Sequence, residues 1–338
     1  MRFRFRGDIV RHRLDVTRLA AVGIIAVTTL AAACGSSNTR SVRVTVPAGS
    51  SFATAVDSLA RAGIIASPRL FRFYASARGR DRDLKAGTYV FEPGSSWNDV
   101  LDALTRGKGL VHTVTIPEGF SLASIAQTIG RALAVPPESL VEAATDSAIR
   151  RRLDVPTPTL EGYLFPDTYT FAAGTTPDEV VRMLVTRFER VWKPEWNARL
   201  EQLAMSRHDI LTLASIIEKE ARLAEERPVI SAVYHNRLKI GMLLQADPTV
   251  QYAVAKERRA LTRADLTTDH PYNTYTRRGL PPGPIASPGL GALQAAVDPA
   301  PVSYLYFVAR DDRRHTFSTS VAEHNRAVLR YRLTRRAL

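Results

Sequence analysis

One short stretch, residues 209–222, limits the possible folds more than any other part of the chain. Its apolar residues Ile210, Leu213 and Ile217 recur at three- and four-residue steps, which predicts an amphipathic helix with one buried face. Asp209 stands just before the apolar run and is the expected N-cap. Because such a helix gains most of its stability from packing its apolar face, the surrounding residues must supply a globular core.

Glu218 is an unusual member of this predicted helix. Its neighbours one turn away are Ala214 and Ala221, so its carboxyl group rises from a mostly apolar strip. Desolvation there would raise the pKa of the carboxyl group and let it hold a proton near neutral pH, as a general acid must. The alternative is an ordinary ion pair with Arg222 at i,i+4 on a solvated face, and the helix taken alone favours this alternative.

The composition is that of a globular protein without a recognisable cofactor site. The chain has 338 residues, of which 45% are apolar and 23% charged, enough for two or three domains. Its seven histidines show no HExxH or HxH spacing, and neither a nucleotide-binding glycine loop nor a GxSxG elbow occurs. The single cysteine cannot form an internal disulfide. No metal site and no cofactor are therefore expected.

The first 39 residues predict attachment to a membrane. Six arginines precede residue 19, and an uncharged run extends from Leu19 to Thr39. A basic flank followed by apolar and small residues is typical of an export segment whose arginines stay in the cytoplasm. The sequence Ala31-Ala-Ala-Cys34 resembles a lipoprotein cleavage site, which makes Cys34 a candidate for lipidation; an uncleaved signal anchor fits equally well. Both alternatives place residues 40–338 on the outer, periplasmic side of the cell inner membrane.

The net charge of +13 predicts an anionic neighbour. Arginines concentrate at both ends of the chain, and residues 333–338 form a short basic tail. Membrane lipid, an acidic cell-wall polymer and nucleic acid are the candidate partners. No basic stretch with interleaved aromatic residues resembles a nucleic-acid reader, so nucleic acid is not expected.

Residues 40–135 contain a repeated strand–turn–helix pattern. Residues 42–49 match residues 111–119 as a strand that ends in a Pro-containing turn. Helical patterns follow three serines, which are the expected N-caps: Ser51, Ser96 and Ser121. The pattern predicts a small α+β module and resembles LysM-like glycan-binding modules. A spacer that only holds the rest of the chain away from the membrane is the alternative.

The rest of the chain predicts a second and larger α+β domain. Residues 136–158 are interpreted as a helix and a proline-containing linker, and residues 159–332 as the domain itself. Residues 177–204 begin with a proline and two acids and predict one amphipathic helix. The run from Tyr304 to Val308 predicts a strand. The expected fold class is α+β, with a membrane-anchored small module followed by the larger domain.

Several polar and aromatic blocks after residue 159 share their order and spacing with a known family. The blocks are LEGYLFPDTY (160–169), LASIIEKEA (213–221), HNRLKIGMLLQADPTVQYA (235–253), YNTY (272–275), GLPPGPIASPG (279–289), YLYFVA (304–309) and HTFSTSVAEHN (315–325). Together they resemble the YceG-like endolytic murein transglycosylases over roughly residues 40–332. The sequence departs from the family pattern at Ala246, Ser287 and Ser320, where a small hydroxyl residue, Asn and Thr are usual.

The resemblance implies a lyase that cleaves the β-1,4 bond between MurNAc and GlcNAc inside peptidoglycan strands. The product would be a 1,6-anhydro-MurNAc end, formed when the sugar's own C6 hydroxyl attacks C1, so a lone acid–base suffices. The resemblance assigns this catalytic role to Glu218. It also implies termination of nascent strands beside peptidoglycan synthases. The alternative from another class is a non-catalytic cell-wall-binding envelope protein.

A second group of residues is predicted to bind the glycan. Tyrosine, asparagine, glutamine and acidic side chains on loops stack on sugars or hydrogen-bond to them, although each is also compatible with a structural role. The candidates inside the blocks are Glu161, Tyr163, Glu220, Asn236, Gln245, Asp247, Tyr252, Asn273 and Tyr275. Glu220 is also the alternative catalytic acid, since it lies two residues after Glu218.

Overall fold

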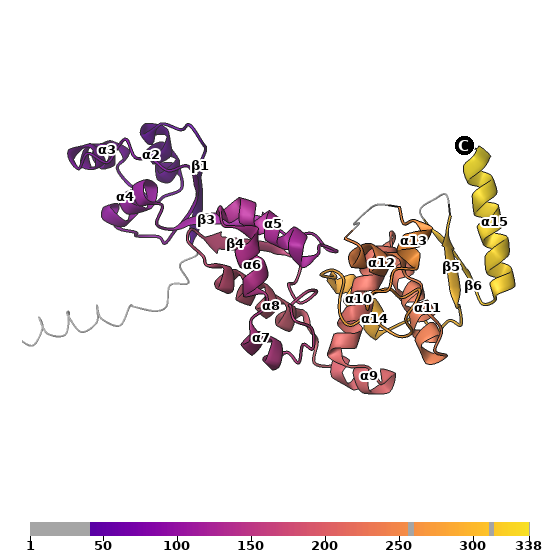
Figure 1. The fold of residues 1–338 in the computed structure, drawn as a ribbon. Coiled ribbons are helices and arrows are strands. Elements are labelled where there is room, and N and C mark those ends of the chain that lie inside the picture. The colour runs from indigo at the N-terminus through magenta and orange to yellow at the C-terminus, as the bar shows by residue number, and fades with distance from the viewer. Residues whose placement is uncertain (1–40, 256–259, 311–313, 338) are drawn as a thin grey trace, which may run out of the picture.

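The structure is a computed structural model that describes residues 41–255, 260–310 and 314–337. The predicted membrane segment and Cys34 lie outside the described residues. Within the described ranges, no helix combines the length and the apolar character that crossing a bilayer requires. The described chain is of mixed α+β class, as predicted, with antiparallel sheets and many helices (Figure 1).

The N-terminal lobe, residues 41–110, contains the first two strand–helix copies. Its elements are β1 (Val42–Val46), α2 (Phe52–Arg61), α3 (Pro68–Ala77), β2 (Gly87–Phe91) and α4 (Trp97–Arg106). Two predicted caps are confirmed, because the side chains of Ser51 and Ser96 each accept a hydrogen bond from the backbone N–H three residues on. A hydrophobic cluster of its own, which includes Phe71 and Tyr89, fills this lobe.

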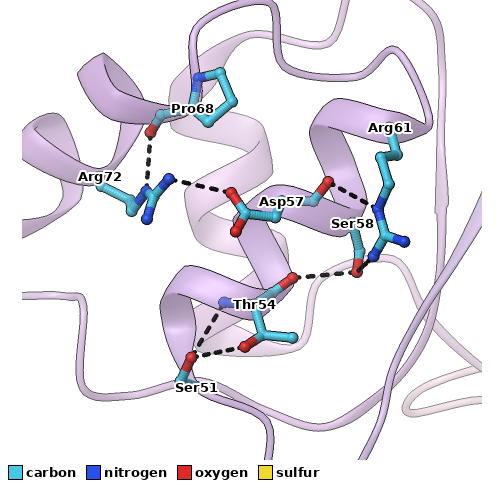
Figure 2. A network of polar contacts seen from close by, with 7 residues as sticks. All are labelled: Ser51, Thr54, Asp57, Ser58, Arg61, Pro68 and Arg72. Atoms are coloured by element: carbon cyan, nitrogen blue, oxygen red, sulfur yellow. Dashed lines mark hydrogen bonds and ion pairs between the residues drawn. The ribbon is translucent and has the colours of Figure 1, made fainter.

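Helix α3 has no counterpart in the predicted repeat, and polar contacts connect it to α2 (Figure 2). Arg72 on α3 donates to the Asp57 carboxylate on α2 at 3.1 Å and to the backbone carbonyl of Pro68 at 3.4 Å. At the start of α2, the Ser51 hydroxyl caps the helix and lies 2.8 Å from the Thr54 hydroxyl. Arg72 and Asp57 are both exposed to solvent, so this ion pair adds little stability.

One antiparallel sheet runs through the N-terminal lobe and into the rest of the protein. Its order is β1-β2-β3-β4, with β3 at Leu110–Thr115 and β4 at Thr168–Ala172. The buried residues Val114 and Ile116 belong to a second, larger hydrophobic cluster. The third strand–helix copy therefore packs with the larger part of the protein. The hydrophobic clusters divide within β3, earlier in the chain than the predicted module boundary at residue 135.

Five helices follow β3 and contribute to the second cluster. Their bounds are α5 (Leu122–Leu133), α6 (Pro137–Ala143), α7 (Ser147–Arg152), α8 (Pro177–Val191) and α9 (Trp196–Leu203). Ser121 caps α5 as predicted. The single helix predicted over residues 177–204 is wrong, because the chain breaks into α8 and α9 around Pro194. A proline inside a helix has no N–H to donate and clashes with the preceding turn.

Helix α10 (Arg207–Glu220) lies among the helices of the C-terminal part (Figure 1). It starts earlier than predicted, because Ser206 is the N-cap and Asp209 is the third residue of a reciprocal capping box. Apart from Asp209, every residue from His208 to Ile217 is buried. The sequence therefore predicted the helix correctly but underestimated its burial: α10 is a core helix, and only Arg207 and Asp209 in its first turn and the residues of its last turn reach solvent.

The remaining elements follow α10 in the chain. They are the 3₁₀ helix η1 (Ala224–Glu226), α11 (Arg227–Lys239), α12 (Asp247–Ala253), α13 (Arg263–Leu266), α14 (Leu290–Val297), β5 (Tyr306–Ala309), β6 (His315–Ser318) and α15 (Val321–Ala337). Helices α11, α12 and α14 contact α10 directly. The predicted strand at 304–308 is confirmed as β5, which pairs antiparallel with β6. Figure 1 shows this hairpin and α15 at the opposite end of the molecule from the N-terminal lobe.

Candidate active site

The last turn of α10 borders a cleft of about 730 Å³. Its walls come from α10, the turn after β3, the start of α12 and the β5–β6 hairpin. The lining residues are Glu118, Gly119, Glu218, Lys219, Glu220, Arg222, Asp247, Pro248, Gln251, Ala260, Ala309 and His315. Four of them carry carboxyl groups, which gives the cleft side chains able to transfer protons.

Glu218 is nearly buried at this wall, since its side chain is 8% exposed. Its Oε2 accepts a hydrogen bond from the Gly289 backbone N–H at 3.2 Å, and its Oε1 accepts one from Arg227 Nη2 at 3.3 Å. Burial raises the pKa of Glu218, Arg227 opposes this rise, and the nearby charge of Glu118 adds to it. Among the described residues Glu218 pairs with Arg227 and not with Arg222, so the solvated i,i+4 pair considered from the sequence is not formed.

Glu118 is a cleft carboxylate that sequence reasoning did not select. Arg227 Nη2 lies 3.5 Å from Glu118 Oε2 and 3.3 Å from Glu218 Oε1, so one guanidinium group joins two carboxylates. Glu118 belongs to the turn at 117–119, which the sequence repeat identified only as a turn. The equivalent residue of the first copy is Ala48, so the turn itself does not require an acid there. The acid at this position in only one of two otherwise matching turns was the sequence signal that could have identified Glu118 as a candidate site residue.

Backbone hydrogen bonds hold this turn against the loop that precedes α14. The Gly119 N–H donates to the Ser287 carbonyl, and the Ser287 N–H donates to the Phe120 carbonyl, each at 2.8 Å. Lys219 Nζ on α10 also donates to the Gly119 carbonyl at 3.2 Å. These contacts bring the turn after β3 and the end of α10 together, although about a hundred residues separate them in the chain.

Three glycines lie against the side chains of Glu118, Glu218 and Arg227 and leave the space that these side chains occupy. A Cβ added to Gly289 would lie 1.8 Å from Glu118 Oε1, and one added to Gly291 would lie 2.5 Å from Arg227 Nη1. Gly119 adopts a φ of +75°, a conformation that glycine reaches without strain. The close approach of side chains to these backbones therefore depends on the absence of a Cβ.

Glu220 and Asp247 form a second acidic pair on the same cleft. The Tyr234 hydroxyl donates to Glu220 Oε1 at 3.2 Å, and the Tyr275 hydroxyl donates to Asp247 Oδ1 at 2.5 Å. Burial, followed by the charge of Asp247, raises the pKa of Glu220 to about 7. Glu220 is thus also able to carry a proton near neutral pH, and it stays the alternative catalytic acid.

A histidine–carboxylate pair completes the cleft wall on the hairpin side. His315 Nδ1 lies 2.7 Å from Glu226 Oε2, and the His315 backbone N–H donates to Glu226 Oε1 at 2.9 Å. Both side chains are about 10% exposed, so the carboxylate fixes the orientation of the ring. Sequence reasoning missed this pair, because only the packing of β6 on η1 brings the two residues together.

Two predicted glycan-binding residues lie in the interior. The Glu161 carboxylate accepts hydrogen bonds from the Leu122 backbone N–H at the start of α5, at 2.9 and 3.1 Å. Tyr163 is fully buried, and its hydroxyl forms a 2.8 Å hydrogen bond with His208 Nδ1. Their polar groups hold segments of the fold together, and neither residue lines the cleft, so their positions do not support contact with glycan.

Two predicted asparagines are also in structural positions. Asn236 donates from Nδ2 to the carbonyls of Val302 and Tyr304, both at 2.9 Å, and it borders a different cavity of about 770 Å³. Asn273 is fully buried, and its Nδ2 donates to two carbonyls of the 266–268 segment. Each amide group fixes a loop, so the predicted contacts with glycan are not supported for these residues either.

The other predicted residues cluster at the α12 side of the cleft. Asp247 and Glu220 line it directly, and Tyr275 reaches it through its hydrogen bond to Asp247. Gln245 is exposed two residues before Asp247, with a φ of +49°. Tyr252 borders a small adjoining cavity and packs against Tyr272, with ring centroids 4.9 Å apart.

The three departures from the family pattern fall in ordered positions. Ala246 is fully buried directly before α12. Ser287 is fully buried, and its backbone forms the hydrogen bonds that hold the turn after β3. The Ser320 hydroxyl accepts a hydrogen bond from the Glu323 N–H at the start of α15. The Ser287 hydroxyl itself is buried and has no hydrogen-bond partner among the described residues, so at this position only the backbone supplies the contacts.

The fold and the cleft together define a mixed α+β protein in which a core helix presents a buried acid, paired with a guanidinium group, to a carboxylate-lined cleft. The YceG-like family model matches residues 44–330. The chain belongs to the YceG-like family.

Relatives named endolytic murein transglycosylase resemble this chain over most of its length. It is 32% identical over 305 residues to the endolytic murein transglycosylase of Bacillus subtilis (strain 168), covering 86% of this chain and 84% of that protein. It is 31% identical over 319 residues to the endolytic murein transglycosylase of Streptococcus pneumoniae serotype 2 (strain D39), covering 85% of this chain but 58% of that longer protein. The crystal structure of a YceG-like protein from Listeria monocytogenes aligns with a TM-score of 0.59 at 32% identity, over 86% of this chain and all of that one.

Proposed function

We propose that this protein is an endolytic murein transglycosylase, a lyase that cleaves the β-1,4 bond between MurNAc and GlcNAc within peptidoglycan strands. The observation that carries the proposal is the Glu218 carboxyl group, which is buried beside a cleft of a size that accepts sugars and has a raised pKa. Family membership and the names of the relatives support the same activity. A protein that only bound the cell wall would have no use for a desolvated acid, so the non-catalytic alternative is not favoured.

In the proposed reaction Glu218 acts first as an acid and then as a base. Protonated Glu218 donates its proton to the glycosidic oxygen while the bond between that oxygen and C1 of MurNAc breaks. The resulting carboxylate, hydrogen-bonded by Arg227 and by the Gly289 N–H, accepts the proton of the MurNAc C6 hydroxyl as O6 closes on C1. One proton leaves Glu218 and one returns, the product is the 1,6-anhydro end, and no water is consumed.

The glycan-binding surface of this proposal is the α12 side of the cleft. Glu220 and Asp247 line the cleft, and their carboxyl groups are placed to hydrogen-bond sugar hydroxyl or acetamido groups. Tyr275 holds Asp247 in place, while Gln245 and Tyr252 extend the polar and aromatic surface at the edge. The aromatic ring of Tyr252 gives this edge a face on which a sugar can stack.

The proposed setting is the outer side of the cytoplasmic membrane, with residues 159–332 as the catalytic domain. The N-terminal apolar run supports a single anchor, either an uncleaved signal anchor or a lipid on Cys34. The repeated strand–turn–helix part acts as a LysM-like glycan-binding module or as a spacer, and peptidoglycan synthases are the proposed neighbours. Palmitate labelling of the wild type and of Cys34→Ala separates the two anchors, because a lipoprotein loses its label in the variant.

Digestion of purified peptidoglycan by the full chain tests the function. Mass spectrometry of the products should show anhydro-ended fragments from the wild type and none from Glu218→Gln. Glu225→Gln is the matched control, because Glu225 lies nearby on the exposed side of η1 and should leave the activity unchanged. Equal products from wild type and Glu218→Gln would make the assignment of Glu218 wrong. No products from the wild type, together with retained binding to peptidoglycan, would favour the non-catalytic alternative.

A further inference from the structure

Helix α3 in the N-terminal lobe presents apolar side chains to solvent. Leu70 and Phe73 lie one turn apart on its outer face and are 59% and 74% exposed. The opposite face of the same helix carries Phe71 and Ala75, which are fully buried in the lobe's hydrophobic cluster. The fold therefore does not need the outer pair for its core, and adjacent exposed apolar side chains are typical of an interaction surface.

The segment around this apolar pair is basic. Residues 61–85 contain seven arginine or lysine residues and two aspartates; because Arg72 and Arg80 pair with Asp57 and Asp102 outside the segment, a net charge of +3 remains. Arg69 is exposed next to Leu70 on the outer face of α3. Arg78, just after the helix, stacks over the Tyr74 ring at 3.7 Å. Exposed aromatic and aliphatic side chains flanked by arginines are the combination found on helices that lie on anionic lipid surfaces.

The position of the lobe in the chain favours a membrane as the partner. Within the uncharged run that predicts the membrane segment, the strongly apolar part extends from Leu19 to Ala33, and β1 begins at Val42. Eight intervening residues span at most about 28 Å even when fully extended. A lobe on so short a tether stays beside the bilayer, where the high effective concentration lets a weak contact form. In Figure 1, α3 lies at the outer end of this lobe, away from the catalytic part.

We propose that the outer face of α3 lies on the anionic surface of the membrane, with Leu70 and Phe73 in the interfacial layer and Arg69 beside lipid phosphate groups. The lobe then has two attachments, the N-terminal segment and α3. Two attachments restrict its rotation above the membrane, which a flexible tether alone would allow. This inference rests on the proposed membrane anchor and is independent of the proposed catalytic activity.

Photocrosslinking of the full chain in vesicles tests the contact. The vesicles contain phosphatidylethanolamine and alkyne-bearing phosphatidylglycerol, and the variant is Phe73→p-benzoylphenylalanine, with the same replacement at Leu70 as a second position. Ile240→p-benzoylphenylalanine is the control, because Ile240 is 62% exposed and lies at the end of α11, far from the lobe. After irradiation, fluorophore coupling to the alkyne should reveal lipid adducts at positions 73 and 70 and only background at 240. Adding Arg69→Gln should lower the adduct yield by about fivefold.

Three results would overturn the proposal. The first is a lipid yield at positions 73 and 70 no higher than at position 240. The second is an adduct with added peptidoglycan in place of lipid, which would make the face a glycan-binding surface. The third is an adduct with a second protein chain, which would make it a protein interface. Peptidoglycan digestion by the same variants separates this question from the catalytic one, since Phe73 and Ile240 lie outside the cleft.

Discussion

Removing Arg227 should raise the pKa of the proposed catalytic acid. Arg227 Nη2 lies 3.3 Å from Glu218 Oε1, and the two side chains are only 20% and 8% exposed, so solvent screens this pair weakly. With an effective dielectric constant of about 20, the direct attraction at this distance is about 5 kcal/mol. The net contribution of Arg227 to the pKa of Glu218 is smaller than this attraction, because Glu118 shares the same guanidinium group and because solvent rearranges when the charge is removed. Arg227→Met should therefore raise the pKa of Glu218 by about 1–3 units.

The pH dependence of kcat/KM on peptidoglycan measures this shift. A general acid must be protonated when it acts, so activity falls as the pH rises through the pKa of Glu218. This fall is the alkaline limb of the pH profile, and in Arg227→Met it should move to higher pH by the same 1–3 units. Glu118→Gln should move it to lower pH, because the charge of Glu118 raises the pKa of Glu218.

The matched control is Arg222→Met. Arg222 lines the same cleft, but Glu218 pairs with Arg227. The control is expected to keep the alkaline limb in place, whatever its effect on the overall rate. An unchanged limb in Arg227→Met, a shift to lower pH, or an equal shift in Arg222→Met would refute the electrostatic reasoning.

Three further changes test other parts of the structure. Folding raises the pKa of Glu220 from 4.5 to about 7, so the stability that its proton contributes is complete below about pH 4.5 and is lost as the pH rises to about 7. Urea unfolding of the wild type should therefore show a free energy of unfolding that falls by up to about 3 kcal/mol between these pH values, and Glu220→Gln should abolish this fall. The same fall in the variant would contradict the burial of the Glu220 carboxyl group. Glu161→Gln weakens the charged hydrogen bonds from the Leu122 N–H and should lower the free energy of unfolding by about 1–2 kcal/mol. The KM for peptidoglycan should stay unchanged, and a raised KM would indicate that Glu161 contacts the glycan. Gly162→Ala would place a Cβ 2.4 Å from Pro284 Cβ, at a φ of +82°, so it should destabilise the fold by more than about 2 kcal/mol. A melting temperature equal to that of the wild type would contradict this prediction.

The parts of the structure that local rules govern could be predicted from the sequence. The caps Ser51, Ser96 and Ser121 follow from short-range hydrogen bonding at helix starts. The apolar setting of Glu218 follows from neighbours at i−4 and i+3, and burial does raise its pKa. The order and spacing of the sequence blocks indicate the family without any knowledge of the fold. All of these features depend on residues close together in the chain or on their order along it.

The composition of the cleft could not be predicted in the same way. Polar residues inside the blocks looked alike, yet Tyr163 and Asn273 are fully buried with structural hydrogen bonds, while Asp247 lines the cleft. Which of these side chains faces the cleft depends on how the loops pack, and polar character alone does not reveal it. Even the extent of burial along α10 depended on packing with α11, α12 and α14.

The sequence by itself determined the helix, the acid on it and the family. Only the tertiary structure decided that Glu218 pairs with Arg227, and that Glu118 shares this guanidinium group. Glu118 reaches the site because the turn after β3 pairs with the segment at Ser287, a contact between distant parts of the chain. The periodic pattern of a helix reports only on residues a few positions apart in the chain. The charges that set the pKa of an acid act through space, so their positions depend on the tertiary structure.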